Sequence, residues 1–211
     1  MTDTSIRASG ACFCAAAVTT LALNVLVSPH LPAGSFATIA ASQVYFVRQV
    51  IAAIVAMALV FGLAGLRDSR LAGTGNFAGL AFILSLAGQV LLFAIEFGQA
   101  FTVHDYALHA PAALDAAITD PHSPLATGAI VAIATFYLGW LSLAVALLLA
   151  RCIPRLAAGV LLLGFLATPL LSAIKSLGAV GGIIASLIVG TGWFLLGLQM
   201  MRAPRGQHPA A

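Results

Sequence analysis

The sequence predicts an all-α, polytopic membrane protein with six transmembrane helices, and three observations support this fold class. Hydrophobic residues make up 62% of the 211 residues and charged residues only 7%, whereas a soluble domain carries about 25% charged residues. The chain divides into six apolar stretches, each close to the ~20 residues that a helix needs to cross a bilayer. Most of the nine Lys and Arg residues fall in alternate connecting segments, as the positive-inside rule requires.

The first three predicted spans cover residues 8–27, 42–66 and 77–101. The first is followed by a segment rich in residues that break helices (Pro29, Pro32, Gly34). The second ends at a charged turn that begins at Arg67 and contains two glycines (Gly73, Gly75). Turns of this composition end apolar helices, so the second and third spans should form a hairpin.

The last three predicted spans cover residues 125–150, 156–174 and 178–201. The long connection before them includes residues 111–118, which we expect to form a short helix on the membrane surface, because Pro111 suits a first helical turn. Pro169 should kink the fifth span. The spans form one membrane domain, residues 1–201, and the polar residues 202–211 are expected to be a disordered cytoplasmic tail.

The basic residues predict the orientation of the six spans. Seven arginines lie in the two tails and in the second and fourth connections, which share one side of the membrane in a six-span count (Arg7, Arg67, Arg70, Arg151, Arg155, Arg202, Arg205). The other connections hold only Lys175, at their rim. Both termini should therefore be cytoplasmic. The net charge of +3 is spread thinly, so it does not indicate a nucleic-acid partner.

The third span carries a polar stripe. Its polar side chains, at spacings of four, seven and three residues, fall on one helical face (Ser85, Gln89, Glu96, Gln99). Such a face cannot contact lipid cheaply, so it should contact other helices or line a wet cavity.

Arg48 and Glu96 are predicted to form an ion pair. Each lies about 24 residues from the centre of the turn between the second and third spans, so two antiparallel helices bring them to a similar depth. A lone charge at the membrane centre costs at least about 2.5–3.5 kcal/mol, and pairing lowers that cost. We therefore expect an Arg48–Glu96 salt bridge one to two turns below the outer surface.

Further polar residues should complete a ligand-binding cavity open to the outside; all reach the depth of Arg48 and Glu96 except Gln89, which extends the stripe to mid-membrane. The candidate residues are Arg48, Glu96, Gln89, Gln99, Asn24, Tyr45 and Lys175. Intramembrane ionisable groups are candidates for a functional site. The alternative is that the Arg48–Glu96 pair only fixes the helix register and that Gln89 bonds to a neighbouring helix.

Two other patterns have site-forming spacings. Asp105 and His109 would share a face of a helix and, with His104, could bind zinc or iron, but solvated loop histidines are the default interpretation of this pattern; no other cofactor is predicted. The residues Gly178, Gly182, Ser186 and Gly190 recur every four positions. This ridge of small residues allows a close helix approach, either within the chain or at a seam with a second copy or another membrane partner.

Parts of the chain resemble small six-span bacterial membrane proteins of unassigned function. The resemblance rests on residues 138–141 (LGWL), residues 151–159 (RCIPRLAAG) and the Glu96-Phe97 pair that leaves the third span. It implies a multi-pass protein of the bacterial inner membrane and no particular activity.

Three functions fit these patterns. The first is a small ligand-binding or permease-type protein that uses the outer cavity, with Glu96 as counter-ion. The second is a non-catalytic subunit or scaffold that associates through the sixth span. The third is a membrane-embedded enzyme in which Glu96 acts with outer-loop histidines. We rank an enzyme last and assign no catalytic residue.

Overall fold

In a computed structural model, the described residues, 3–67, 75–150, 155–174 and 178–202, form an all-helical fold without strands. Six helices are long: α1 (Asp3–Ala22), α3 (Gln43–Leu66), α4 (Asn76–Gly98), α7 (Pro124–Ala150), α8 (Arg155–Ala173) and α9 (Gly178–Arg202). Shorter helical segments connect or extend them: η1 (Leu23–Val27), η2 (Ser28–His30), α2 (Phe36–Ala40), η4 (Gln99–Val103), α5 (His104–His109) and α6 (Pro111–Thr119).

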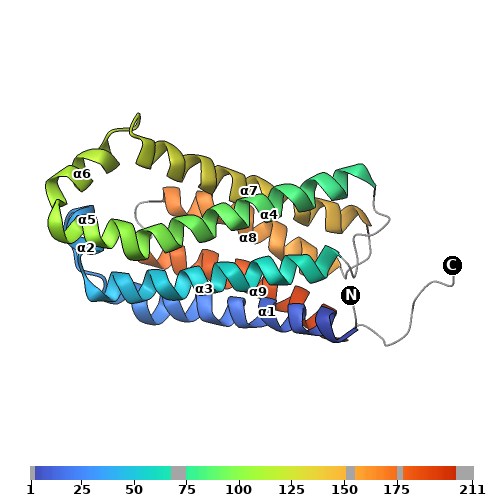
Figure 1. The fold of residues 1–211 in the computed structure, drawn as a ribbon. Helices are drawn as coiled ribbons and strands as arrows, with labels where there is room; N and C mark the ends of the chain where they lie inside the picture. The colour runs from blue at the N-terminus through green and yellow to red at the C-terminus, as the bar shows by residue number, and fades with distance from the viewer. Residues whose placement is uncertain (1–2, 68–74, 151–154, 175–177, 203–211) are drawn as a thin grey trace, which may run out of the picture.

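The six long helices form a closed ring. Its order of neighbours is α1, α3, α4, α7, α8 and α9, and α9 packs back on α1. Figure 1 shows the helices running side by side along one axis, with α2, α5 and α6 gathered at one end and the start of α1 at the other. We call these the cap end and the terminal end. A ring of this kind has a central space, and the side chains that fill it differ between the two ends.

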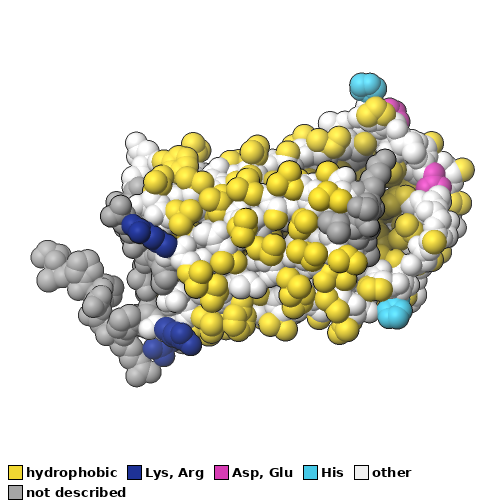
Figure 2. Space-filling view, turned by 180° about the vertical axis from the view of Figure 1, so that it is seen from behind, with side chains coloured by type: hydrophobic (Ala, Val, Ile, Leu, Met, Phe, Trp, Pro, Cys, Tyr) yellow, Lys and Arg dark blue, Asp and Glu magenta, His cyan; other side chains and the backbone are white. Residues whose placement is uncertain are grey.

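Five helical stretches are long and apolar enough to cross a membrane: Thr4–His30, Gln43–Leu66, Asn76–His109, Pro124–Ala150 and Val180–Arg202. The α8 helix is shorter and is not among them, so the sixth span stays a prediction. Figure 2 shows a band of hydrophobic side chains around the middle of the molecule, with arginine or lysine at the terminal end and histidine and acidic side chains at the cap end. Many large apolar side chains of the long helices are strongly exposed, such as Ile54 and Leu80, each at 64%. That surface suits lipid better than water.

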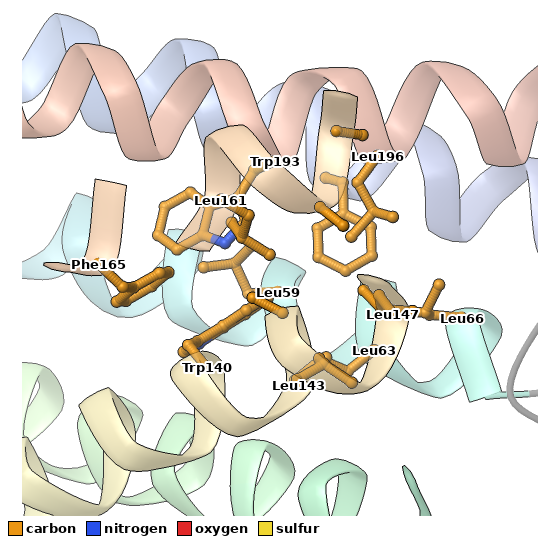
Figure 3. Close-up of a cluster of buried hydrophobic side chains, with 14 of the residues drawn as sticks. Leu59, Leu63, Leu66, Trp140, Leu143, Leu147, Leu161, Phe165, Trp193 and Leu196 are labelled. Carbon is orange, nitrogen blue, oxygen red and sulfur yellow. The ribbon is translucent and has the colours of Figure 1, made fainter. Parts of the chain in front are cut away.

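The terminal half of the ring is filled by what we call the apolar plug, shown in part in Figure 3. Its buried members are Phe13, Leu59, Leu63, Trp140, Leu143, Leu147, Leu161, Phe165, Trp193 and Leu196. The rings of Trp140 and Phe165 stack with centroids 5.6 Å apart and an angle of 6°. Side chains from five of the six long helices, all except α4, therefore meet at one apolar centre.

Two pairs of glycines let neighbouring helices approach closely. A Cβ atom added to Gly139 would lie 2.6 Å from the Cα of Ser85, and one added to Gly88 would lie 2.5 Å from the Cα of Phe136. These glycines set the distance between α4 and α7. Gly10 and Gly197 play the same part between α1 and α9, because a Cβ on Gly197 would lie 2.4 Å from the carbonyl oxygen of Gly10.

The cap consists of α2, α5 and α6 packed over the ends of α3 and η4. Its small apolar core contains Ala37, Ala40, Tyr45, Val103, Ala107 and Leu114. The Asp115 carboxylate accepts a 2.8 Å hydrogen bond from the backbone N–H of Ala37 and so joins α6 to the start of α2. The helix expected at 111–118 is present as α6, with a proline at its first turn; its position on a membrane surface stays a prediction.

Helical structure extends further into the connections than the sequence indicated. The helical structure of the third predicted span continues past residue 101, because π-helical η4 and then α5 extend it to His109. The proline-bearing connection after α1 contains α2, whose start is capped by the Ser35 hydroxyl accepting from the Thr38 N–H. The predicted tail, 202–211, lies outside the described residues except for Arg202.

Candidate ligand-binding cavity

Two π-helical segments lie where the polar side chains gather. Asn24 lies in η1, between α1 and the 3-10 segment η2, and Gln99 lies in η4, between α4 and α5. A π-segment inserts an extra residue into a helix and turns the side chains that follow it; such segments occur frequently at functional sites. The local backbone of α1 and α4 therefore changes at the same level, next to Arg48 on α3.

The Arg48 guanidinium is held by three side chains. Its Nε donates to the Ser28 hydroxyl at 3.0 Å, and its Nη1 donates to the Gln49 Oε1 at 2.5 Å. Its Nη2 lies 3.5 Å from the Asn24 Oδ1. Asn24 in turn donates through its Nδ2 to the Ser186 hydroxyl at 2.8 Å. These bonds connect α3 to α1 and α9.

The predicted Arg48–Glu96 salt bridge is wrong. Among the described residues, the only ion pair within 4.0 Å joins Asp105 and His109. Gln49, which is 2% exposed, lies between the two charges: its Oε1 accepts from Arg48, and its Nε2 donates to the Glu96 Oε2 at 2.8 Å. An amide has one donor and one acceptor end, so it bridges a cation and an anion without their direct contact.

Gln99 and Tyr45 extend this network toward the cap. The Gln99 Oε1 accepts from Gln49 Nε2 and, at 3.0 Å, from the Tyr45 hydroxyl. Gln49 thus bonds to three partners and is the centre of the network. Gln49 was not among the candidate residues selected from the sequence; the helical spacing of Tyr45, Gln49, Ala52 and Ala56 is the signal that could have found it.

Gln89 lies deeper and is fully buried. Its Nε2 donates to the Ala56 carbonyl at 3.3 Å, and its Oε1 accepts from the Trp140 Nε1 at 3.1 Å. The alternative reading, in which Gln89 bonds to a neighbouring helix backbone, is therefore realised. Ser85 completes the stripe by donating to the Ala81 and Gly139 carbonyls, both at 2.7 Å. The stripe faces α3 and α7.

A cavity of about 300 Å³ lies among these residues. Arg48, Glu96, Gln89 and Asn24 line it, together with mainly apolar and aromatic side chains that include Leu23, Val55, Leu59, Leu92, Phe136, Tyr137 and Trp193. Since Leu59 and Trp193 also belong to the apolar plug, the plug forms its floor. A concave, mostly apolar site with a few polar groups is typical of small-molecule binding.

Both charged groups keep unused hydrogen-bonding capacity at this cavity. Within the described residues, the Glu96 Oε2 accepts one hydrogen bond, from Gln49, and its Oε1 accepts none. Each of the two terminal nitrogens of Arg48 carries two N–H groups and donates one of them to a described residue. The second N–H of each nitrogen has no partner among the described residues. The cavity can therefore offer one anionic acceptor and one cationic donor to the same molecule.

Trp193 differs from the other polar groups around the cavity. Its Nε1 is the only buried side-chain nitrogen or oxygen without a hydrogen-bond partner in the described ranges. An unpaired buried donor costs about 1–3 kcal/mol. The indole of Trp140, by contrast, is paired with Gln89.

The remaining predicted site residues that the structure describes are not among the residues that line the cavity. Tyr45 and Gln99 belong to the network but do not line the cavity, and Lys175 lies outside the described residues. The His104 Nδ1 donates to the Ala40 carbonyl at 2.6 Å, and Asp105 and His109 contact each other separately at 3.2 Å. No group of three potential metal ligands occurs among the described residues, and His104 is not brought together with that pair.

The ridge of small residues on α9 is divided among different surroundings. Ser186 bonds to Asn24, and a Cβ on Gly190 would contact the Ala17 carbonyl at 3.4 Å, so both face α1. A Cβ on Gly182 would meet nothing within 4 Å. The surroundings of Gly178 are not described. The closest approaches of α9 instead use Gly197 and Gly192, which sequence reasoning did not select.

No protein-family model, curated protein or solved structure matches this chain. The resemblance to six-span bacterial proteins therefore stays an expectation from the sequence. The function must be argued from the cavity.

Proposed function

We propose that this protein is a six-span integral protein of a bacterial inner membrane with both termini in the cytoplasm. At 1.5 Å per residue, the 19 residues of α8 extend about 28 Å, close to the ~30 Å hydrocarbon thickness. The described arginines at the terminal end (Arg7, Arg67, Arg155, Arg202) support a cytoplasmic position for that end. The cap and the cavity then lie toward the periplasm.

We infer that the cavity binds a small molecule and that the protein acts as a binding protein or permease. The observation that carries this inference is the arrangement at Gln49: a guanidinium and a carboxylate border one cavity, bridged by an amide, and each retains a donor or acceptor that no described residue uses. A pair used only for helix register gains most from direct contact, because a charge-assisted bond between them would be the stronger one.

Transport would require the apolar plug to separate, because it closes the ring on the terminal side. The stacked Trp140–Phe165 pair and Trp193 occupy that position. The same residues thus form the floor of the cavity and close the ring on its terminal side. A cavity that is closed on one side only is the arrangement of an outward-facing state in an alternating-access cycle.

Cysteine reactivity tests whether the cavity can be reached by solutes. All three native cysteines are replaced by alanine, and the full-length protein in lipid nanodiscs receives either Ala52→Cys, at the cavity wall, or Ala146→Cys, buried at 2% beside the plug. A small methanethiosulfonate should modify Ala52→Cys at least tenfold faster. Equal, slow rates would contradict a binding function and favour the scaffold alternative.

A further inference from the structure

A second cavity, of about 220 Å³, adjoins the first. Thr20, Asn24, Phe136, Tyr137 and Trp193 line both of them. Two spaces that share five wall residues behave as two lobes of one site. We call the cavity at Arg48 and Glu96 the charged lobe and this one the second lobe.

The second lobe reaches the outside beside α8 and α9. Its walls include Thr168 near the end of α8 and Gly182 near the start of α9; Gly182 is exposed. Figure 1 shows the cap over α3, α4 and α7, with the near ends of α8 and α9 stopping short of it. The second lobe is therefore the side of the site that the cap leaves uncovered.

The walls of the second lobe suit an aromatic group better than a polar one. Phe136, Tyr137, Phe165 and Trp193 supply ring surfaces, and aromatic pairs gain about 0.5–1.5 kcal/mol beyond their buried area. Two of the hydroxyls in the lobe already donate to their own helices: Thr168 to the Gly164 carbonyl and Ser186 to the Gly182 carbonyl, each at 2.8 Å. A hydroxyl has one hydrogen, so neither of these two has a donor left for a polar ligand.

The charged lobe favours a head group with both charges. Arg48 and Glu96 together are neutral, and a single ion placed beside them would leave one uncompensated charge in a largely apolar surrounding, which is costly. A head group that carries an anion and a cation meets the Arg48 donors and the Glu96 Oε1 that no described residue uses, and adds no net charge.

Resting on the binding function argued above, we propose that the site takes an aromatic zwitterion, with its ammonium at Glu96, its carboxylate at Arg48 and its ring in the second lobe.

Protection of Ala52→Cys from methanethiosulfonate tests the proposed class. L-Tryptophan should slow the modification at least tenfold, whereas tryptamine, which lacks the carboxylate, and indole-3-propionate, which lacks the ammonium, should slow it less than twofold. L-Alanine, which has the head group without the ring, should also protect less than twofold. The proposal is overturned if tryptophan gives no protection or if either single-charge analogue protects as well. In both cases the proposed binding function itself is judged separately: it is retained if the Ala52→Cys thiol reacts quickly with methanethiosulfonate, and it is rejected if the thiol does not react.

Filling the second lobe tests the placement of the ring. Gly182→Phe adds a side chain where no atom lies within 4 Å, and Gly79→Phe on α4 is a matched control with the same free space. We expect the tryptophan concentration for half-maximal protection to rise at least tenfold in Gly182→Phe and to stay within twofold in the control. An unchanged value in Gly182→Phe would overturn the placement.

A charge variant keeps the proposal testable if Gly182→Phe does not fold. Glu96→Gln leaves Arg48 as the only charge of the pair, so the variant should favour indole-3-propionate, which carries only a carboxylate. The protecting potency of indole-3-propionate relative to that of tryptophan should rise at least tenfold. An unchanged order of the two probes would show that Glu96 does not bind the ammonium and would overturn the proposal.

Discussion

The two halves of the helix ring solve the same packing problem in opposite ways. At the terminal end, large apolar side chains fill the centre completely, and Trp140 and Leu143 are fully buried. At the cap end, the centre holds a hydrogen-bonded network and about 300 Å³ of space. Filling both halves with leucine would cost nothing in polar desolvation. The polar half is therefore retained at an energetic cost, which is the pattern expected where a protein binds something.

The largest loss of stability should come from a change at the α4–α7 contact, which both halves share. Gly139→Leu places a side chain against the backbone of α4, where even a Cβ would approach to 2.6 Å, and should destabilise the fold by about 3 kcal/mol. Gly128→Leu, on the same helix with open space around it, should change stability little. SDS titration of the purified protein measures both; equal stabilities would contradict the close α4–α7 approach.

Removing one charge from the polar half should destabilise the fold somewhat less, and removing the second charge should restore part of the lost stability. Arg48→Gln leaves the Glu96 charge without a cation and should cost about 2–3 kcal/mol. Adding Glu96→Gln removes the remaining charge, so the double variant should recover at least half of that loss in the same titration. A double variant less stable than either single variant would show that the two charges do not act as a pair.

The two tryptophans offer a finer comparison at the boundary between the halves. Trp140→Phe removes the donor to Gln89 and leaves a buried acceptor unpaired, at a cost of about 1–3 kcal/mol. Trp193→Phe removes an indole N–H that has no partner in the described residues, so it should change stability by less than about 1 kcal/mol. The reverse order of thermal unfolding midpoints would contradict the assigned hydrogen bonds.

The smallest effect should be confined to the cap. Asp115→Ala removes the acceptor of the Ala37 N–H and should cost about 1 kcal/mol. Hydrogen exchange measures this loss: the amides of α2 should exchange faster in the variant, and those of α7 and α9 should not change. Exchange that rises equally in all helices would show that the cap does not open on its own.

The sequence predicted the helical fold well where the pattern was long and apolar, because length and hydropathy are properties of each segment alone. It also placed Arg48 and Glu96 at one cavity, since the hairpin between α3 and α4 fixes their depth. It failed at Gln49, because the choice between a direct and a bridged pair depends on side-chain rotamers. The second lobe could not be predicted, because Thr168, Gly182 and Phe136 come from three helices whose neighbours the sequence does not specify.

The sidedness of Ala52→Cys tests the central claim most directly. In spheroplasts, a membrane-impermeant methanethiosulfonate added from the periplasmic side should modify this cysteine at least tenfold faster than in inverted membrane vesicles, where the reagent meets the plug. Equal rates from both sides, or faster modification in inverted vesicles, would contradict a cavity that opens at the cap end and is closed by the apolar plug.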